Sequence, residues 1–388
     1  MPTEFISLAF PNASTELEPI PGAPIDPAFL KRYAQNLDDY GFNYTLQPYD
    51  SSYFDPFTTG ATIAAHTKNL KVIIALRPNT VYPTVAAKSL ATLDQLSNGR
   101  AVVHFIAGGS DAEQAKEGDF LPKDERYARL EEYIKILKRA WASADPFDWE
   151  GKHYQFKGFS NRVRPVNGSS IPISVGGSSD EAYRIGGSLA DIFGLWGEPL
   201  KETKQQIDRI YAEADKAGRT DRPRIWVTFR PIVAATEELA WEKAHATLDA
   251  LQTHRVAGLG KVPANAPAPQ NVGSQRLLDI AKKGEVQDRA LWYPTVTATN
   301  ARGASTALVG SYQTVIDSIV DYVDLGCELI SIRGYDNLND AVDYGRYILP
   351  GVRRALEARG ENGDGEGNGG GVVEKVAKAV ESVTVRDG

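Results

Sequence analysis

The 388-residue chain could form one large α/β barrel or two ordinary domains, and its 42% hydrophobic and 24% charged residues are typical of a globular protein without membrane association. Its net charge of −7, with basic residues scattered among acidic ones, argues against nucleic acid as the main partner. One cysteine and five histidines without ligand spacing predict neither a disulfide framework nor a metal site, and the lack of a signal-peptide pattern predicts a cytoplasmic protein.

Short β-branched and aromatic runs alternate with helical-period segments, which is typical of repeated βα units. The runs predict eight strands, at residues 4–10, 43–47, 71–75, 101–106, 171–175, 191–195, 225–233 and 329–332. Helical patterns follow nearly all of them, for example at residues 83–96, 126–142, 179–189, 200–217, 237–250 and 312–325. Eight such units predict a (β/α)8 TIM barrel, whose reactive face lies at the carboxyl ends of its strands.

Two segments interrupt this alternation. Residues 147–159 alternate aromatic and polar side chains around Glu150-Gly151, which predicts a β-hairpin on the barrel rim. Residues 254–305 form a long insertion in a barrel domain that spans residues 1–358. Insertions of this length are usually functional, for example as a lid over the active site, or else disordered.

The composition changes abruptly in the last thirty residues or so. Residues 359–371 are rich in glycine, which predicts a flexible linker. In residues 372–388, apolar side chains fall on one face of a possible short helix. This tail can either fray or dock on a neighbouring subunit, and we favour weak, accessory docking.

The fifth predicted strand ends in Gly176-Gly177-Ser178-Ser179, directly before a helical pattern. Backbone N–H groups at a helix start are unpaired and attract anions, the glycines permit close approach, and the serines add hydroxyl donors. The same residues also fit an ordinary N-cap followed by an acidic first turn. The turn is therefore either a phosphate site or a cap. Because it matches neither the dinucleotide fingerprint nor the Walker A motif, ATP is disfavoured.

Four stretches of sequence carry a family resemblance: "ALRPNTVYPTVAAKSLATLDQLSNGR", "VVHFIAGGSDAEQAKEGDFLPKDERY", "GGSSDEAYRIGGSLADIFGLWGEP" and "STALVGSYQTVIDSIVDYVDLG". Together they resemble the bacterial luciferase-like flavin monooxygenases and, more narrowly, the FMNH2-dependent alkanesulfonate monooxygenase group. The resemblance covers roughly residues 1–356, and its motifs keep their order and approximate spacing.

The resemblance implies a TIM barrel that binds reduced FMN delivered by a separate NAD(P)H-dependent flavin reductase, with O2 as co-substrate and a C4a-peroxyflavin as the oxidant. In the alkanesulfonate group, oxygenation of the carbon that bears sulfur releases sulfite and an aldehyde. We also expect a homo-oligomer, either a dimer or a tetramer.

The resemblance further implies where the flavin binds. Its phosphate site falls on the glycine-serine turn, joined by the tyrosine of "DERY", and Lys123 stands where the family often has histidine. A lysine still suits a phosphate as a point charge. The cofactor-binding residues so implied are Gly177, Ser178, Ser179, Tyr127, Lys123 and Ala107.

Six residues are implied for the substrate and oxygen pocket: Arg230, Tyr335, Trp196, Arg302, Tyr53 and His104. Thr228 and Arg230 stand where the family has arginine and histidine, and Arg230 could hold an anion bidentately without exchanging protons near neutral pH. Tyr53 replaces a family cysteine, and Arg302 lies on the expected mobile loop. His104 replaces asparagine, and strand alternation leaves open whether it faces the barrel interior or the helices.

These departures concentrate on the substrate side and leave the phosphate side largely intact. The sequence therefore predicts a two-component FMNH2-dependent monooxygenase that acts on an organosulfonate or related small organosulfur compound. Three alternatives stay open: oxygenation of an alkane, amine or heterocycle, a flavin-binding protein without turnover, and a deazaflavin-dependent oxidoreductase.

Overall fold

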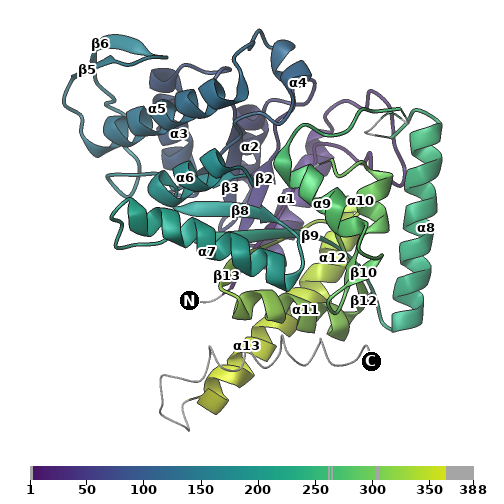
Figure 1. The fold of residues 1–388 in the computed structure, drawn as a ribbon. Helices are drawn as coiled ribbons and strands as arrows, with labels where there is room; N and C mark the ends of the chain where they lie inside the picture. The colour runs from purple at the N-terminus through teal and green to yellow at the C-terminus, as the bar shows by residue number, and fades with distance from the viewer. Residues whose placement is uncertain (1–2, 261–262, 264, 303–305, 364–388) are drawn as a thin grey trace.

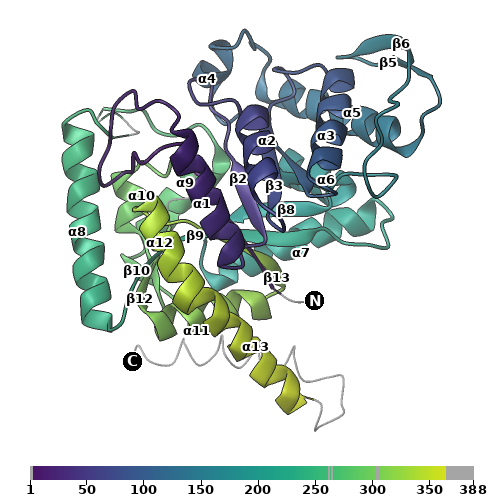
Figure 2. The same ribbon diagram turned by 180° about the vertical axis from the view of Figure 1, so that it is seen from behind.

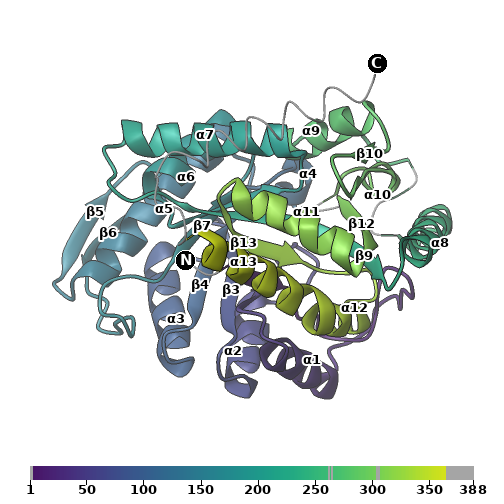
Figure 3. The same cartoon turned by 90° about the horizontal axis from the view of Figure 1, so that it is seen from below.

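The fold is a closed barrel of eight parallel strands, and Figure 3 shows the molecule from below. The computed structural model describes residues 3–260, 263, 265–302 and 306–363. In order around the barrel, the strands are β1 (Glu4–Ser7), β2 (Tyr44–Gln47), β3 (Lys71–Leu76), β4 (Ala101–Phe105), β7 (Ile173–Gly176), β8 (Ile192–Trp196), β9 (Arg224–Ala234) and β13 (Cys327–Ile332). Pairing of β13 with β1 closes the ring, so the predicted (β/α)8 barrel is confirmed.

Helices surround the barrel, as Figures 1 and 3 show. They are α1 (Pro27–Asp39), α2 (Pro56–His66), α3 (Pro83–Leu96), α5 (Lys123–Ala142), α6 (Asp180–Leu189), α7 (Leu200–Lys216), α11 (Tyr312–Asp324) and a final run of α12 (Asn337–Asp343), a π-helical turn (Tyr344–Ile348) and α13 (Leu349–Gly363). Local signals start them: Asp26 and Asp55 cap α1 and α2, each directly before a proline at the first helical position.

The carboxyl-terminal helix α13 continues into the predicted linker. Residues 359–363 are helical, so α13 ends about one turn beyond residue 358, where the composition predicted the barrel domain to end. The remainder of the glycine-rich linker and the amphipathic tail, residues 364–388, lie outside the described residues.

A layer of apolar side chains fills the barrel interior. Seven of the eight strands each contribute one residue to this cluster: Ile6, Tyr44, Ile73, Val102, Ile192, Trp226 and Leu329. The eighth strand, β7, contributes Ser174, which is fully buried and paired in register with His104. Because side chains alternate along a strand, this register places His104 inside the barrel.

The predicted hairpin is also confirmed. Strands β5 (Phe147–Glu150) and β6 (Gln155–Phe159) pair antiparallel and lie at the periphery of the molecule in Figure 1. A short helix, α4 (Asp111–Ala115), follows β4.

The excursion between the seventh and eighth barrel strands begins earlier than residue 254. Its elements are α8 (Glu237–Val256), α9 (Val272–Ala281), β10 (Val286–Gln287), β11 (Leu291–Trp292), α10 (Pro294–Ala298) and β12 (Ala307–Ser311). Figures 1 and 2 show α8 at one edge of the molecule, away from the ring of helices. The three strands here were not predicted, because two of them are two residues long and β12 leads straight into a helix.

The barrel interior predicts a stability effect. Replacement of fully buried Ile73 by alanine should lower the free energy of unfolding by about 2–5 kcal/mol, because it removes apolar contacts and leaves a cavity. Urea denaturation followed by circular dichroism measures this change. The control Val85→Ala, on the exposed face of α3, should change it by less than about 0.5 kcal/mol; equal effects of the two substitutions would contradict the assignment.

Candidate active site

The carboxyl ends of the barrel strands bring the predicted site residues to one mouth. The glycine-serine turn follows β7, whereas Arg230 and Arg333 stand at the ends of the barrel portions of β9 and β13. In the ring order, β7 lies opposite β1, which neighbours β13. The mouth therefore has a glycine-serine side and an arginine side.

The glycine-serine turn is both a helix cap and an open cradle. Ser179 caps α6, since its Oγ accepts a hydrogen bond from the Ala182 N–H at 3.3 Å. The same Oγ donates to the Tyr127 hydroxyl oxygen at 3.1 Å, so the phenol proton can still be donated to a bound oxygen. Gly177 has a φ of +136°, and a Cβ there would lie 3.0 Å from the Ala182 Cβ. The turn thus keeps a narrow space that a side chain at Gly177 would crowd.

Burial of Tyr127 raises the pKa of its phenol, which keeps it protonated at neutral pH. Next to it, the Ser178 hydroxyl donates to the Gln206 Oε1 at 3.3 Å, and the Tyr183 hydroxyl donates to the same oxygen at 2.8 Å. The predicted cradle residues Gly177, Ser178, Ser179 and Tyr127 are therefore in one place, supported by Gln206 on α7.

The other two predicted cofactor residues lie at the start of α5 and in the loop after β4. Lys123 is exposed in the first turn of α5, one turn before Tyr127. Ala107 follows β4 and packs, partly buried, against the main core.

Helix α9 of the insertion reaches the cradle, which the sequence did not indicate. A Cβ at Gly273 would lie 2.9 Å from the Trp196 ring and 3.5 Å from the Ser178 Oγ, so the helix backbone packs directly on both. Asn271 caps α9, and its side chain lies 3.5 Å from where a Cβ of Gly109 would be. Asparagine is a common helix N-cap, so Asn271 is a local signal for the start of α9. No local signal predicts which barrel strand α9 packs against.

An ion pair between a partly exposed arginine and a buried glutamate fixes α9 in this position. Arg276 donates from Nε to Glu198 Oε1 at 2.8 Å and from Nη2 to Glu198 Oε2 at 2.5 Å. Glu198 belongs to the "WGEP" stretch after β8 and is 1% exposed. Bidentate pairing of this kind fixes orientation as well as distance. It therefore holds the amino terminus of α9 against the turn that carries Trp196.

His104 lies in the barrel interior below the mouth. Its Nδ1 is 2.9 Å from the Ser174 Oγ, and its ring is 5.2 Å from that of Trp226. Burial lowers the pKa of His104 to about 4, so the imidazole is neutral at physiological pH. A neutral imidazole can donate or accept a hydrogen bond at its second nitrogen, but it is a poor source of protons.

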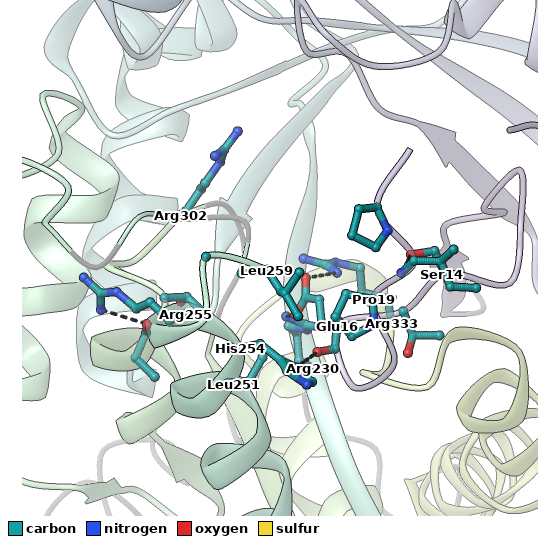
Figure 4. Close-up of a pocket in the computed structure, with 17 residues that line it drawn as sticks. Ser14, Glu16, Pro19, Arg230, Leu251, His254, Arg255, Leu259, Arg302 and Arg333 are labelled. Carbon is teal, nitrogen blue, oxygen red and sulfur yellow. Dashed lines mark hydrogen bonds and ion pairs between the residues drawn. The ribbon is translucent and has the colours of Figure 1, made fainter. Parts of the chain in front are cut away.

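A cavity of about 340 Å³ lies on the arginine side of the mouth (Figure 4). It lies between the loop after β1, the end of α8, and residues 298–302. Its lining is Ser14, Thr15, Glu16, Pro19, Ile20, Pro21, Arg230, Leu251, His254, Arg255, Gly258, Leu259, Gly260, Ala298, Thr299, Arg302 and Arg333. Among these described residues are four arginines and one carboxylate, that of Glu16.

Glu16 makes the central contacts of this cavity. Its Oε2 accepts from Arg230 Nη1 at 2.6 Å, and its Oε1 lies 3.8 Å from Arg333 Nη1. Figure 4 shows these three side chains together, with Arg302 apart from them. The backbone carbonyl of Glu16 also lies 3.0 Å from the His254 Nδ1, which ties the loop after β1 to α8. The sequence did not mark Glu16, because it lies in a loop without a motif.

Arg230 is 2% exposed and is held from three sides. Its Nη2 donates to the Gly334 carbonyl at 2.9 Å, and its guanidinium carbon lies 3.5 Å from the centre of the Tyr335 ring. Burial opposes its charge, but Glu16 and the tyrosines raise its pKa on balance. For Arg333, burial and then repulsion by Arg230 lower the pKa to about 10, so both guanidiniums are charged at neutral pH.

The other predicted pocket residues are distributed around this cavity. Tyr335 is buried behind Arg230 in an apolar cluster with Trp292 and does not line the cavity. Tyr53 lies in the loop after β2, 40% exposed, against Phe54. Burial raises the pKa of its phenol to about 12.

Arg302 forms an exposed ion pair with Asp50, with Nη2 and Oδ2 3.0 Å apart. Of the expected lid, residues 261–262, 264 and 303–305 lie outside the described residues.

The described part of the chain contains neither a metal-binding cluster nor a membrane-spanning helix. No group of three or more histidine, cysteine, aspartate or glutamate side chains there is arranged to hold a metal ion. No helix there is both long enough and apolar enough to span a bilayer.

Comparisons with known proteins add family information to this geometry. A family model described as "Luciferase-like monooxygenase" matches residues 3–329. The structure of a riboflavin lyase with modified FMN and its substrate riboflavin is similar at a TM-score of 0.74 and 19% identity, over 93% of this chain and 92% of that chain.

Two further solved structures show the same fold. An EDTA monooxygenase from Chelativorans sp. BNC1 has a TM-score of 0.71 and 18% identity, over 93% of this chain and 95% of that chain. A long-chain alkane monooxygenase has a TM-score of 0.72 and 17% identity, over 93% and 92% of the two chains.

The ion pair that holds α9 can be tested by Arg276→Met. We expect a loss of about 1–3 kcal/mol in the free energy of unfolding, because the buried Glu198 carboxylate loses its partner. Hydrogen exchange should also become faster in α9. Lys282→Met is the matched control, since it removes only an exposed ion pair with Asp279. If hydrogen exchange in α9 became faster in Lys282→Met but not in Arg276→Met, the role of Arg276 would be contradicted.

The low pKa of His104 predicts a pH dependence of stability. As the pH falls below the ordinary pKa of 6.5, His104 becomes protonated in the unfolded chain, whereas in the folded protein it stays neutral until about pH 4. The free energy of unfolding therefore decreases as the pH is lowered from about 6.5 to 4. From pH 7.5 to 5.5 this group should cost about 1.4 kcal/mol, and His104→Asn should abolish that share. Urea denaturation at both pH values measures it, with His66→Asn as a histidine substitution at an exposed position for comparison.

Proposed function

Because the chain belongs to the luciferase-like monooxygenase family, we propose that it oxygenates a small organic anion with reduced FMN and O2. The leading candidate substrate is an organosulfonate or a related organosulfur compound, with sulfite and an aldehyde as products. The observation that carries the proposal is the pair of guanidiniums, buried Arg230 and partly exposed Arg333, on a cavity at the barrel mouth. Barrels of this type place their chemistry at this end.

The glycine-serine turn fits the phosphate of FMN. Unpaired N–H groups at the start of α6 and the Tyr127 phenol offer donors around a space that Gly177 keeps clear, and the Ser178 hydroxyl joins them if its proton turns from Gln206 to the phosphate. Ser179 orients the phenol, and exposed Lys123 adds positive charge from α5. The printed description of one structural relative includes a modified FMN, which agrees with this choice of cofactor.

The arginine side fits an anionic head group. Guanidinium groups bind sulfonate and carboxylate oxygens through paired N–H donors, and a buried position strengthens that attraction. Arg333 is charged at neutral pH, and its side chain is more exposed than that of Arg230, at 12% against 2%. One structural relative is named for EDTA, a polycarboxylate, so a related barrel is described as acting on an organic anion.

Bound reduced FMN would supply the chemistry, which is the activation of O2 and transfer of one oxygen atom to the substrate. This chain's residues supply binding and orientation. Tyr335 holds the guanidinium of Arg230 in place by its ring face, and Trp196 packs against α9 at the mouth. We assign His104 a hydrogen-bonding role from below, since its neutral ring is a poor proton donor.

The reaction requires a supply of reduced flavin, so the proposal includes a separate NAD(P)H-dependent flavin reductase in the cytoplasm. It also includes a homodimer or homotetramer, which light scattering can measure.

Turnover tests this function directly. With an added flavin reductase, NADH and O2, we expect a panel of linear alkanesulfonates to release sulfite and aldehyde in equal amounts. Oxygenated product without sulfite would favour a non-sulfur substrate, and substrate conversion that requires a reduced deazaflavin would exclude FMN as the cofactor. FMN binding without any substrate loss would contradict the enzymatic role.

Substitution of Arg230 tests most directly whether the arginine side binds the substrate head group. Arg230→Ala should raise KM for the sulfonate at least about tenfold, because the head group loses a charge-assisted partner. Arg230→Lys should recover part of this loss, since it keeps the charge but not the paired donors. The matched control is Arg209→Ala, an exposed residue on α7 that pairs with Asp180. Equal KM values for the wild type and Arg230→Ala would contradict a role of Arg230 in binding.

The phosphate cradle predicts a difference between two flavins. Tyr127→Phe and Ser178→Ala should each weaken binding of reduced FMN by about tenfold, through loss of one hydrogen bond to the phosphate. Their affinity for riboflavin, which has no phosphate, should stay unchanged. Anaerobic fluorescence titration measures both; an equal loss for the two flavins would place these residues away from the phosphate.

A further inference from the structure

The buried face of α7 carries one side-chain amide, that of Gln206, which is 3% exposed. Its Oε1 accepts hydrogen bonds from the Ser178 hydroxyl at 3.3 Å and from the Tyr183 hydroxyl at 2.8 Å. Its Nε2 is also buried but has no hydrogen-bond partner among the described residues. Because burial of an unpaired amide donor is costly, a glutamine at this position calls for an explanation beyond packing.

The amide of Gln206 has two orientations of nearly the same shape, since a half turn exchanges its oxygen and its nitrogen. The position that Oε1 occupies lies within hydrogen-bonding reach of the Ser178 and Tyr183 hydroxyl oxygens. A nitrogen at that position has two protons and can donate one to each hydroxyl oxygen. The reversed orientation therefore pairs the amide protons that otherwise have no partner.

The orientation of Gln206 decides where the single hydroxyl proton of Ser178 points. With Oε1 toward Ser178, that proton is donated to Gln206 and is not available to a ligand. With the amide reversed, the Ser178 Oγ accepts a hydrogen bond, and its proton can be donated into the glycine-serine turn. Burial raises the pKa of the Tyr183 phenol, so it stays protonated, and it lies close enough to Ser178 to donate to it instead. Each donor of this network then has an acceptor once an acceptor occupies the turn.

We propose that Gln206 is a positioning residue for the flavin phosphate, because its reversed amide directs the proton of Ser178 toward that group. A phosphate dianion has acceptors and no donor, so it favours the orientation in which Ser178 donates. The terminal hydroxyl of riboflavin can itself donate to Ser178, so it binds without this reversal. This inference rests on the proposed function, since it concerns the cofactor end of the same site.

Gln206→Met tests the inference, because it keeps the length of the side chain and removes both polar atoms. In anaerobic fluorescence titrations of the full-length protein, this variant should bind reduced FMN about fivefold more weakly, with its affinity for reduced riboflavin unchanged. The matched control is Gln205→Met, at the exposed neighbouring position of α7, which should leave both affinities at their wild-type values. Unchanged or tighter binding of FMN by folded Gln206→Met would overturn the inference.

A double-mutant cycle shows whether Gln206 acts through Ser178. Ser178→Ala removes the proton that Gln206 directs, so the addition of Gln206→Met to it should weaken FMN binding by less than about twofold further. A further loss of about fivefold, equal to the loss in the wild-type background, would show that the two residues act independently and would overturn the inference.

A merely structural role of Gln206 would be to pair the Tyr183 hydroxyl, and a second double variant isolates that role. Tyr183→Phe/Gln206→Met removes both ends of this hydrogen bond, so it buries no unpaired hydroxyl. We expect its melting temperature to lie near that of the wild type and the selective loss of FMN affinity to persist. Recovery of the wild-type affinity for FMN would assign Gln206 the structural role alone. Circular dichroism shows whether each variant is folded.

The outcomes distinguish this inference from the function on which it rests. Loss of FMN affinity in Ser178→Ala but not in Gln206→Met would overturn the role of Gln206 and leave the phosphate site intact. Wild-type FMN affinity in both variants would overturn the role of Gln206 and the phosphate site together. Selective loss of FMN affinity in both, without oxygenation of any substrate, would support the role of Gln206 and contradict only the proposed chemistry.

Discussion

The length of β9 is the constraint on which the rest of the structure depends. Residues 224–229 of this strand pair with β8 and β13 and complete the barrel. The next five residues continue past the barrel and pair with β12, the last element of the insertion. Arg230 is the first residue of that extension, so one strand both completes the core and carries the main cation to the mouth. The insertion must then fold back over the site.

The insertion works as part of the site because it is held at both ends. β12 pairs with the extension of β9, and the Arg276–Glu198 pair fixes α9 beside Trp196. Its segments therefore contribute to both sides of the mouth: Gly273 meets the cradle at Ser178, and the end of α8 lines the arginine cavity. A flavin phosphate at β7 and an anionic head group near β9 would lie on different sides of the barrel mouth.

Much of the fold could be predicted from the sequence, because its signals are local. Periods of 2 and 3.6 residues marked all eight barrel strands and most of the surrounding helices, and Ser179 followed by acidic residues marked the start of α6. The turn raised two possibilities, a cap and an anion site, and Ser179 does serve as the cap while Gly177 keeps the space beside it open. The substrate side was harder, since its residues come from loops without a period.

The sequence by itself determined the barrel, its reactive end and the residue types at the ends of its strands, because each depends on neighbours within a few positions. Only the tertiary structure decided that Glu16 meets Arg230, a contact that joins residues 214 positions apart. It also decided that His104 faces inward and is neutral, since its environment comes from β7 and β9. The pKa and the charge partners of a group depend on which groups surround it in space. The order of residues along the chain does not give the distances between groups that are far apart in sequence.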